Sequence, residues 1–220
     1  MLEVDDDNKS ILTIYVLLSD NKSLNRKTLN SLSLLDEFNI TIKWIKALDE
    51  LKLIDPAKST QFSMFMNSGD HIARSFLETF FKKPLSFLLA YQAEYSYLFS
   101  DRGKVFYRKN IDITPETDEV NALMLYPHNS RHIIFPTNFI DSVIKKNDHI
   151  MRNFYWILAQ TLIENNLLIV TLKSCITLEY FDVKSLQNEE QIFQFCDPVV
   201  SEIFDKNKLL LNQNFSNLYE

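Results

Sequence analysis

Glycine is nearly missing from this chain, with Gly69 and Gly103 the only two in 220 residues. Average usage of about 7% would give roughly 15. A loop that wraps around a phosphate, or that exposes a nucleophile on a strained turn, needs a positive φ or a missing Cβ, and glycine supplies both most easily. The scarcity therefore excludes the dinucleotide fingerprint, the P-loop, the kinase glycine loop and the Gly-x-Ser-x-Gly elbow. We accordingly predict no cofactor.

Cysteines and long apolar runs are also scarce, and acidic residues outnumber basic ones by 29 to 23. Cys175 and Cys196 are the only cysteines, and we expect them to be reduced, buried and unpaired. The net charge of −6 opposes binding to nucleic acid or to an anionic membrane. Apolar runs such as 11–18 are far shorter than the roughly 20 residues of a spanning helix. Together with an acidic start where a secretory signal would be basic, this predicts a cytoplasmic or nuclear protein.

Aromatic and aliphatic residues, by contrast, are plentiful. With 17 Phe, 9 Tyr and 46% hydrophobic residues, the chain has ample material for a packed core. We predict a single α+β domain over residues 1–220, with a division into subdomains near 56–61 as the alternative, because Pro56 and a polar stretch mark a loop there.

Periodicity predicts an N-terminal βαβ unit followed by a central antiparallel meander packed against a long helix. Two hairpins, one of them with Gly103 at its turn, supply the four strands of the meander. The predicted strands are 11–18, 40–45, 95–99, 105–108, 120–126, 132–135, 167–172 and 176–181. The predicted helices are 24–37, 70–82, 138–165, 188–195 and 198–211, with one or two further helical turns within 85–91. Ser23 is expected to cap the first helix, and Ser68 or Asp70 the second.

The βαβ unit, with Ser19-Asp20, Arg26 and Ala47-Leu48-Asp49, resembles the start of several nucleotide-using α/β folds, glycosyltransferases and RecA-like cores among them. None of their phosphate-binding or Asp-x-Asp metal motifs follows it. The resemblance implies a site at the βαβ edge, since open α/β sheets bind ligands beyond the carboxyl ends of their strands. The residues implied are Asp20, Arg26 and Asp49.

Few other residues suggest chemistry. The histidines are His71, His128, His132 and His149. His128 and His132 flank a turn beside Arg131, but no further ligand lies at a supporting spacing, so we predict no metal site and water-facing side chains. Cys175 between two apolar segments is expected to be an inert thiol. Glu179, Asp182 and Lys184 resemble the acidic-and-lysine end of metal-dependent nucleases, and we interpret them as surface charge.

The absence of such sites favours a non-catalytic, protein-binding subunit of a larger intracellular assembly, with other subunits or a second copy as partner. Its candidate surface is an apolar segment between polar loops, Phe62, Met64, Phe65 and Met66. The same segment could instead pack into the core.

Two alternatives remain open. One is a transferase or nuclease-like enzyme with its site at the βαβ edge. The other is nucleic-acid binding through the hairpin 95–109, where basic residues alternate with Tyr95, Tyr97, Phe106 and Tyr107. The basic residues of that hairpin are Arg102, Lys104, Arg108 and Lys109.

Overall fold

The computed structural model describes residues 10–47, 50–51, 60–99, 105–110, 112, 131–146, 165 and 167–180, with backbone alone at 98–99, 105–108 and 145–146. Within these ranges, eight strands form one mixed sheet in the order β2-β1-β3-β7-β5-β8-β4, and β6 adds to β5. The strands are β1 (Leu12–Leu17), β2 (Ile40–Ile45), β3 (Phe62–Asn67), β4 (His71–Ile72), β5 (Leu89–Phe99), β6 (Val105–Lys109), β7 (Ile134–Pro136) and β8 (Leu168–Tyr180). The helices are α1 (Lys22–Leu32), the short 3-10 helix η1 (Ser33–Leu35), α2 (Arg74–Lys82) and α4 (Thr137–Lys146). The class is α+β.

The N-terminal βαβ unit is present. β1 pairs in parallel with β2 on one side and with β3 on the other, and α1 connects β1 to β2. β1 and β3 are buried on both faces, as expected for central parallel strands covered by helices. Asn21 caps α1, its Oδ1 accepting a hydrogen bond from the Ser23 N–H at 3.0 Å. The prediction that Ser23 is the cap is therefore wrong by two residues.

The antiparallel hairpin at 95–109 is confirmed, because β5 pairs antiparallel with β6. The four-stranded meander around it is not what the structure shows. β5 pairs in parallel with β8 along most of its length, and β7 lies between β3 and β5, antiparallel to both. The predicted strand at 120–126 lies outside the described residues.

The two predicted strands at 167–172 and 176–181 are one continuous strand, β8. A register shift opposite Ala93 and Tyr95 marks a bulge, and Ser174 there has φ of 61°. A bulge inserts an unpaired residue without ending the strand. Because the bulge places the polar residues Lys173 and Ser174 inside the strand, this part of the sequence resembles a turn.

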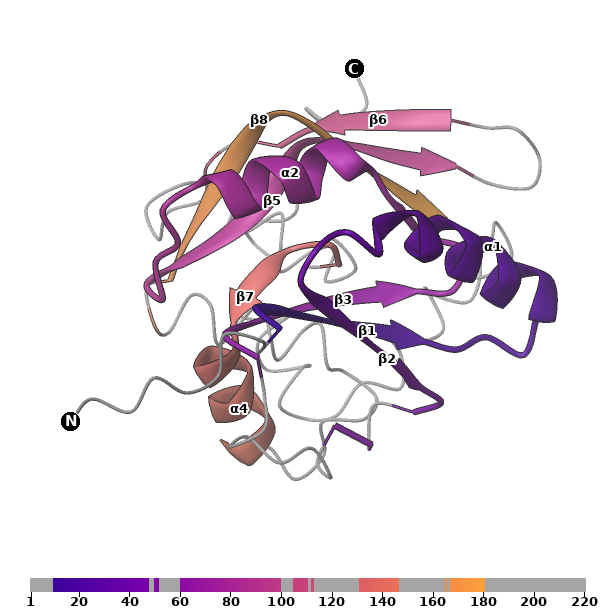
Figure 1. The fold of residues 1–220 in the computed structure, drawn as a ribbon, viewed down its shortest axis with the longest axis horizontal. Coiled ribbons are helices and arrows are strands. Elements are labelled where there is room, and N and C mark those ends of the chain that lie inside the picture. Colours follow the sequence, from indigo (N-terminus) through magenta and orange to yellow (C-terminus); the bar gives the residue numbers. More distant parts are fainter. Residues whose placement is uncertain are drawn as a thin grey trace, which may run out of the picture.

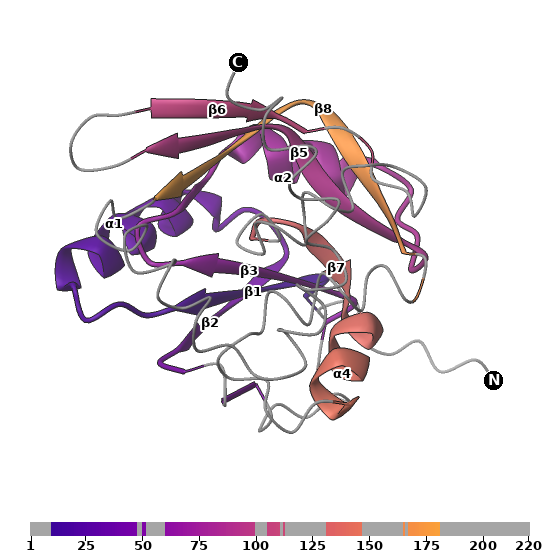
Figure 2. The same cartoon turned by 180° about the vertical axis from the view of Figure 1, so that it is seen from behind.

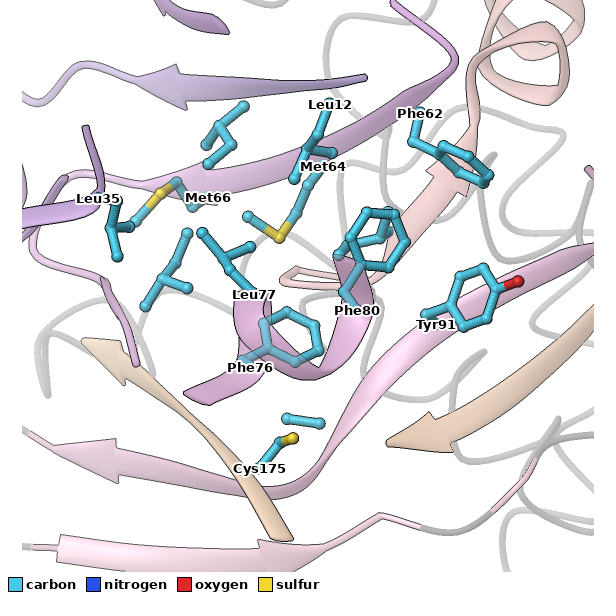
Figure 3. Close-up of a cluster of buried hydrophobic side chains, with 14 of the residues drawn as sticks. Leu12, Leu35, Phe62, Met64, Met66, Phe76, Leu77, Phe80, Tyr91 and Cys175 are labelled. Atoms are coloured by element: carbon cyan, nitrogen blue, oxygen red, sulfur yellow. The ribbon is translucent and has the colours of Figure 1, made fainter. Parts of the chain in front are cut away.

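Helices cover both faces of the sheet, with α1 and α2 on one and α4 on the other (Figures 1 and 2). The sheet bends around α2, so that Phe76, Leu77 and Phe80 lie between β3 and β5 (Figure 3). The Phe80 ring packs edge-on against Phe62 at 5.4 Å and against Tyr91 at 5.5 Å between ring centroids. The main core therefore lies inside the bend.

The opposite face carries a smaller cluster under α4. Phe135 stacks on Phe139 with ring centroids 5.7 Å apart, and Ser63 and Thr137 share a hydrogen bond of 2.8 Å. Tyr15 stacks on Phe65 at 5.2 Å. Burial, reinforced by the charge of Asp141, raises the pKa of Tyr15 to about 12.

Two helix predictions need correction, and a third is described only in part. α4 is described as Thr137–Lys146, and residues 147–164 of the predicted long helix lie outside the described residues. α2 begins at Arg74, and its N-cap residue, Ala73, has no polar side chain with which to cap it. The predicted caps bond elsewhere, Asp70 to the Tyr180 N–H and Ser68 to the Leu17 carbonyl. Residues 89–91 are strand, not helix. α2 ends before Pro84, and Lys83, the residue before this proline, is extended, as such residues usually are.

Cys175 is buried and unpaired, as predicted. Cys196 and the helices predicted at 188–195 and 198–211 lie outside the described residues. In the part of the chain that the structure describes, no helix is long and apolar enough to cross a membrane.

The position of Phe80 predicts a large effect of its truncation. Because its ring is fully buried inside the bend, Phe80→Ala should lower the free energy of unfolding by roughly 3–5 kcal/mol. Leu34→Ala is the matched control, since Leu34 is 75% exposed and should change stability by less than about 0.5 kcal/mol. Urea denaturation of both variants measures the difference, and equal effects would contradict the described core.

Candidate functional site

The parallel strands β1, β2 and β3 end at one edge of the sheet, which we call the carboxyl edge (Figure 1). From β1 the chain passes through α1 to β2 on one side, and it later returns to β3 on the other side. Such a reversal of strand order leaves the loops on either side diverging, and open α/β sheets bind their ligands there. The reversal lies between β1 and β3.

The loop after β1 is held by side chains of α1 and of the segment after β3. Asn25 makes two hydrogen bonds to Ser19, with Oδ1 accepting from its N–H at 3.0 Å and Nδ2 donating to its carbonyl at 2.8 Å. Ser68 Oγ accepts from the same Ser19 N–H at 3.3 Å and donates to the Leu17 carbonyl at 3.0 Å. The backbone of Ser19 is therefore fixed from two directions.

The turn Asn67–Asp70 follows β3, and the Asp70 N–H closes it by donating to the Asn67 carbonyl at 3.0 Å. Gly69 has φ of +102°, and a Cβ there would come within 2.8 Å of the Tyr180 ring. Only glycine meets both conditions. Thr28 of α1 also holds the turn, because its Oγ1 accepts from the Gly69 N–H at 2.7 Å and donates to the Asp70 carbonyl at 3.1 Å.

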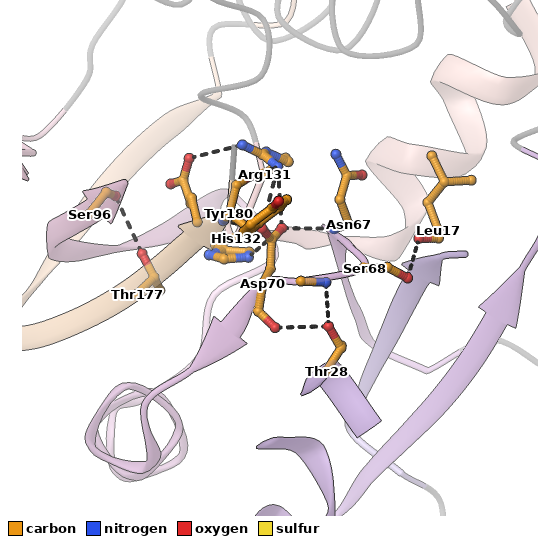
Figure 4. A network of polar contacts seen from close by, with 12 residues as sticks. Leu17, Thr28, Asn67, Ser68, Asp70, Ser96, Arg131, His132, Thr177 and Tyr180 are labelled. Atoms are coloured by element: carbon orange, nitrogen blue, oxygen red, sulfur yellow. Dashed lines mark hydrogen bonds and ion pairs between the residues drawn. The ribbon is translucent and has the colours of Figure 1, made fainter. Parts of the chain in front are cut away.

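The Asp70 carboxylate is fully buried and is surrounded by donors (Figure 4). Oδ1 accepts from the Tyr180 N–H at 2.7 Å, and Oδ2 accepts from the Asn67 N–H at 2.8 Å. His132 Nε2 lies 3.2 Å from Oδ2, and Arg131 Nη1 lies 3.4 Å from both oxygens. Burial alone would raise the pKa of Asp70, but the Arg131 charge and the hydrogen bonds from His132 and Asn67 outweigh it, so its pKa lies below the ordinary value of 3.8.

A second buried carboxylate completes the network. Glu179 Oε2 lies 3.6 Å from Arg131 Nη2, and both side chains are almost closed to solvent. Arg131 also donates to the Tyr180 carbonyl at 3.4 Å. These separations exceed the 2.7–2.9 Å typical of close ion pairs. One guanidinium thus lies between two carboxylates, joining the ends of β3 and β8 to the segment before β7.

Several predicted exposures are wrong here. His132 was expected to face water and Glu179 was interpreted as surface charge, yet both are buried, as is Arg131. They were misjudged because their partners are distant in the chain: His132 contacts Asp70, 62 positions away, and Glu179 pairs with Arg131. The available signal was that Glu179 lies within the apolar strand β8 and that Asp70 directly precedes β4.

The βαβ-edge candidates are only partly placed. Asp20, three residues after β1, and Arg26, in α1, are both exposed, unlike the residues of the buried network. Asp49 lies outside the described residues.

The candidate protein-binding segment is in the core. Phe62, Met64, Phe65 and Met66 form most of β3, and each is at most 1% exposed. The alternative of core packing is therefore the one observed, and these side chains offer no surface to a partner.

The basic hairpin is described only in part. Arg102 and Lys104 lie outside the described residues, and Arg108 is described by its backbone in β6. Lys109, the last residue of β6, is exposed.

No metal centre is formed by the residues that the structure describes, since no three His, Cys, Asp or Glu side chains gather there. His71 is partly buried in β4, and this burial lowers its pKa. His128 and His149 lie outside the described ranges. Because its oxygens are occupied by protein donors, Asp70 acts as a structural junction.

No protein-family model and no curated protein matches the sequence. Solved structures with a similar fold include residues 1–349 of TarS from S. aureus in complex with UDP-GlcNAc, with a TM-score of 0.49 and 12% identity over 78% of this chain and 58% of that one. A further structure of S. aureus TarS gives a TM-score of 0.48 and 12% identity over 84% of this chain and 38% of that one. The chain thus spans less than two thirds of either, and likeness at this level establishes no function.

The buried network predicts a specific dependence of stability on pH. Because the pKa of Asp70 is lower in the folded state, its contribution is complete above the unfolded value of about 4 and is lost as the pH falls below it. Asp70→Asn should lower the free energy of unfolding by roughly 3 kcal/mol at pH 7. The difference from the wild type should shrink as the pH falls below about 4.

Denaturation at a series of pH values tests this expectation. Glu78→Gln is the control, because it removes a carboxylate whose partner Arg74 is exposed and should alter the pH profile far less. Equal profiles for the two variants would show that Asp70 is not held as described.

Proposed function

We propose that this chain binds an anionic ligand of the nucleotide class at the carboxyl edge of β1, β2 and β3, as an α/β enzyme of the transferase type does. The observation that carries the proposal is the reversal of strand order between β1 and β3. A site at such a reversal is the general rule for open α/β sheets.

Side chains, not a glycine-rich loop, would recognise the ligand. The one glycine at this edge, Gly69, accommodates the Tyr180 ring with its missing Cβ, and so leaves no close approach for a phosphate. Ser19, Asp20 and Asn67 are the polar groups with solvent access at the ends of β1 and β3. Hydrogen bonds already fix the backbone of Ser19, which lowers the entropy lost when a ligand binds.

Positive charge is available at the start of α1, which begins at this edge. Lys22 is its first residue, Arg26 follows one turn later, and its first turn contains no acidic residue. The N-terminal end of a helix also carries partial positive charge. Both features support a phosphate-bearing ligand.

Arg26→Ala should therefore weaken ligand binding. Calorimetry and thermal shift with a panel of nucleoside diphosphates, with and without Mg²⁺, measure the affinity; loss of one charge-assisted hydrogen bond should weaken it roughly tenfold. Lys83→Ala is the matched control, because Lys83 is an exposed cation just beyond the C-terminal end of α2, away from the carboxyl edge. If no nucleotide of the panel raises the melting temperature of the wild type, the proposal fails.

A second candidate function is protein binding, as a subunit of an assembly or as a self-associating chain. An exposed apolar patch favours it: Phe87 is 53%, Leu88 78% and Leu168 39% exposed. These residues are neighbours, because Leu89 pairs with Leu168 where β5 and β8 begin. The patch replaces the buried segment of β3 as the surface for this role.

Sedimentation velocity over a range of concentrations tests the second candidate. If the patch mediates contact, Leu88→Asp should abolish self-association or the capture of a defined co-purifying partner, since a charge in an apolar contact is not solvated. Leu34→Asp is the control, as it places the same charge at a similarly exposed leucine on η1. A wild type that stays monomeric and captures no partner would rule the candidate out.

A further inference from the structure

The buried network closes the curled sheet on itself. β4 follows β3 after only three residues, yet β7, β5 and β8 lie between them in the strand order. The four steps from Asn67 to His71 span at most about 14 Å. The sheet must therefore curl until its β4 edge returns to the end of β3, and Asp70 lies at this seam.

Contacts made by Asp70 hold the seam from several sides. The Tyr180 N–H at the end of β8 and the Asn67 N–H at the end of β3 donate to its two oxygens. Arg131 and His132 approach it from the segment before β7. The ends of β3 and β8, which are not neighbours in the sheet, and the segment before β7 thus meet at one carboxylate.

The same turn also holds the loop after β1. Ser68, two residues before Asp70, accepts from the Ser19 N–H and donates to the Leu17 carbonyl. The turn has little freedom to shift, because Gly69 lies against the Tyr180 ring and is bonded to Thr28. A continuous set of contacts therefore runs from the seam to Ser19 at the carboxyl edge.

We infer that Asp70 is a positioning residue for the carboxyl edge: it fixes the turn Asn67–Asp70 against β8, and through Ser68 it holds the backbone of Ser19 in its ligand-ready arrangement. The part of this inference that concerns ligand binding rests on the proposed function. The coupling between the seam and Ser19 does not, and it can be measured without a ligand.

Amide hydrogen exchange of the full chain, resolved by NMR, tests the coupling. Asp70 does not touch Ser19, so loss of its own contacts in Asp70→Asn affects only the Asn67 and Tyr180 amides directly. The inference predicts that the Ser19 amide also exchanges about tenfold faster or more. The Leu18 amide, which donates to the Ile45 carbonyl, should keep its wild-type rate and serves as the internal control.

A second variant keeps the inference falsifiable if Asp70→Asn does not fold. Ser68→Ala removes both hydrogen bonds of the Ser68 hydroxyl, to the Ser19 N–H and to the Leu17 carbonyl, and leaves the contacts of Asp70 in place. It should therefore accelerate exchange at Ser19 and leave the Tyr180 amide unchanged. Wild-type exchange at Ser19 in Ser68→Ala, or in a folded Asp70→Asn, overturns the inference.

The ligand arm uses the tightest-binding nucleoside diphosphate of the panel. Both variants should bind it at least about tenfold more weakly than the wild type, if the arrangement of Ser19 matters for binding. Unchanged affinity in a variant with accelerated exchange at Ser19 would overturn the ligand-ready part of the inference. If the wild type binds no nucleotide, the proposed function fails, while the exchange data still decide the coupling.

Discussion

The closure of the curled sheet at Asp70 is the constraint on which the rest of the structure depends. A buried carboxylate is unfavourable unless donors surround it, and here two backbone N–H groups, a histidine and a guanidinium do so. Such networks contribute less to net stability than apolar packing of the same volume, because desolvation of the charges offsets their attraction. What this network specifies is arrangement, because its contacts join the ends of β3 and β8 to the segment before β7.

The bend that the seam closes also creates the core. α2 fills its interior, so Phe76, Leu77 and Phe80 contact strands from both halves of the sheet (Figure 3). Apolar packing supplies most of the free energy, whereas the seam determines how the two halves are aligned. Positive φ is not confined to glycine in the described residues, since His132 and Ser174 also adopt it. At Gly69, by contrast, any side chain would collide with Tyr180.

The local pattern of residues was sufficient to predict the βαβ unit, the hairpin at 95–109 and the buried thiol of Cys175. Each of these depends on residues close together in the chain or on a continuous apolar run. The parallel pairing of β5 with β8 could not be predicted in this way, because it joins segments about 80 residues apart. The bulge at Ser174 made the single strand β8 look like two strands in the sequence. The seam was missed for a related reason: Asp70, Arg131 and Glu179 each look like surface charge until the fold brings them together.

The direction of the strands separates the two candidate functions in space. β1, β2, β3, β5 and β8 all run the same way, since β7 is antiparallel to both β3 and β5. Their carboxyl ends form the edge near Ser19 and the seam, whereas Phe87, Leu88 and Leu168 lie where β5 and β8 begin. The 13 residues of β8 place Leu168 roughly 40 Å along the strand from Tyr180. A ligand at one end and a protein at the other would therefore not compete for the same surface, and binding at either end can be tested by variants that leave the other intact.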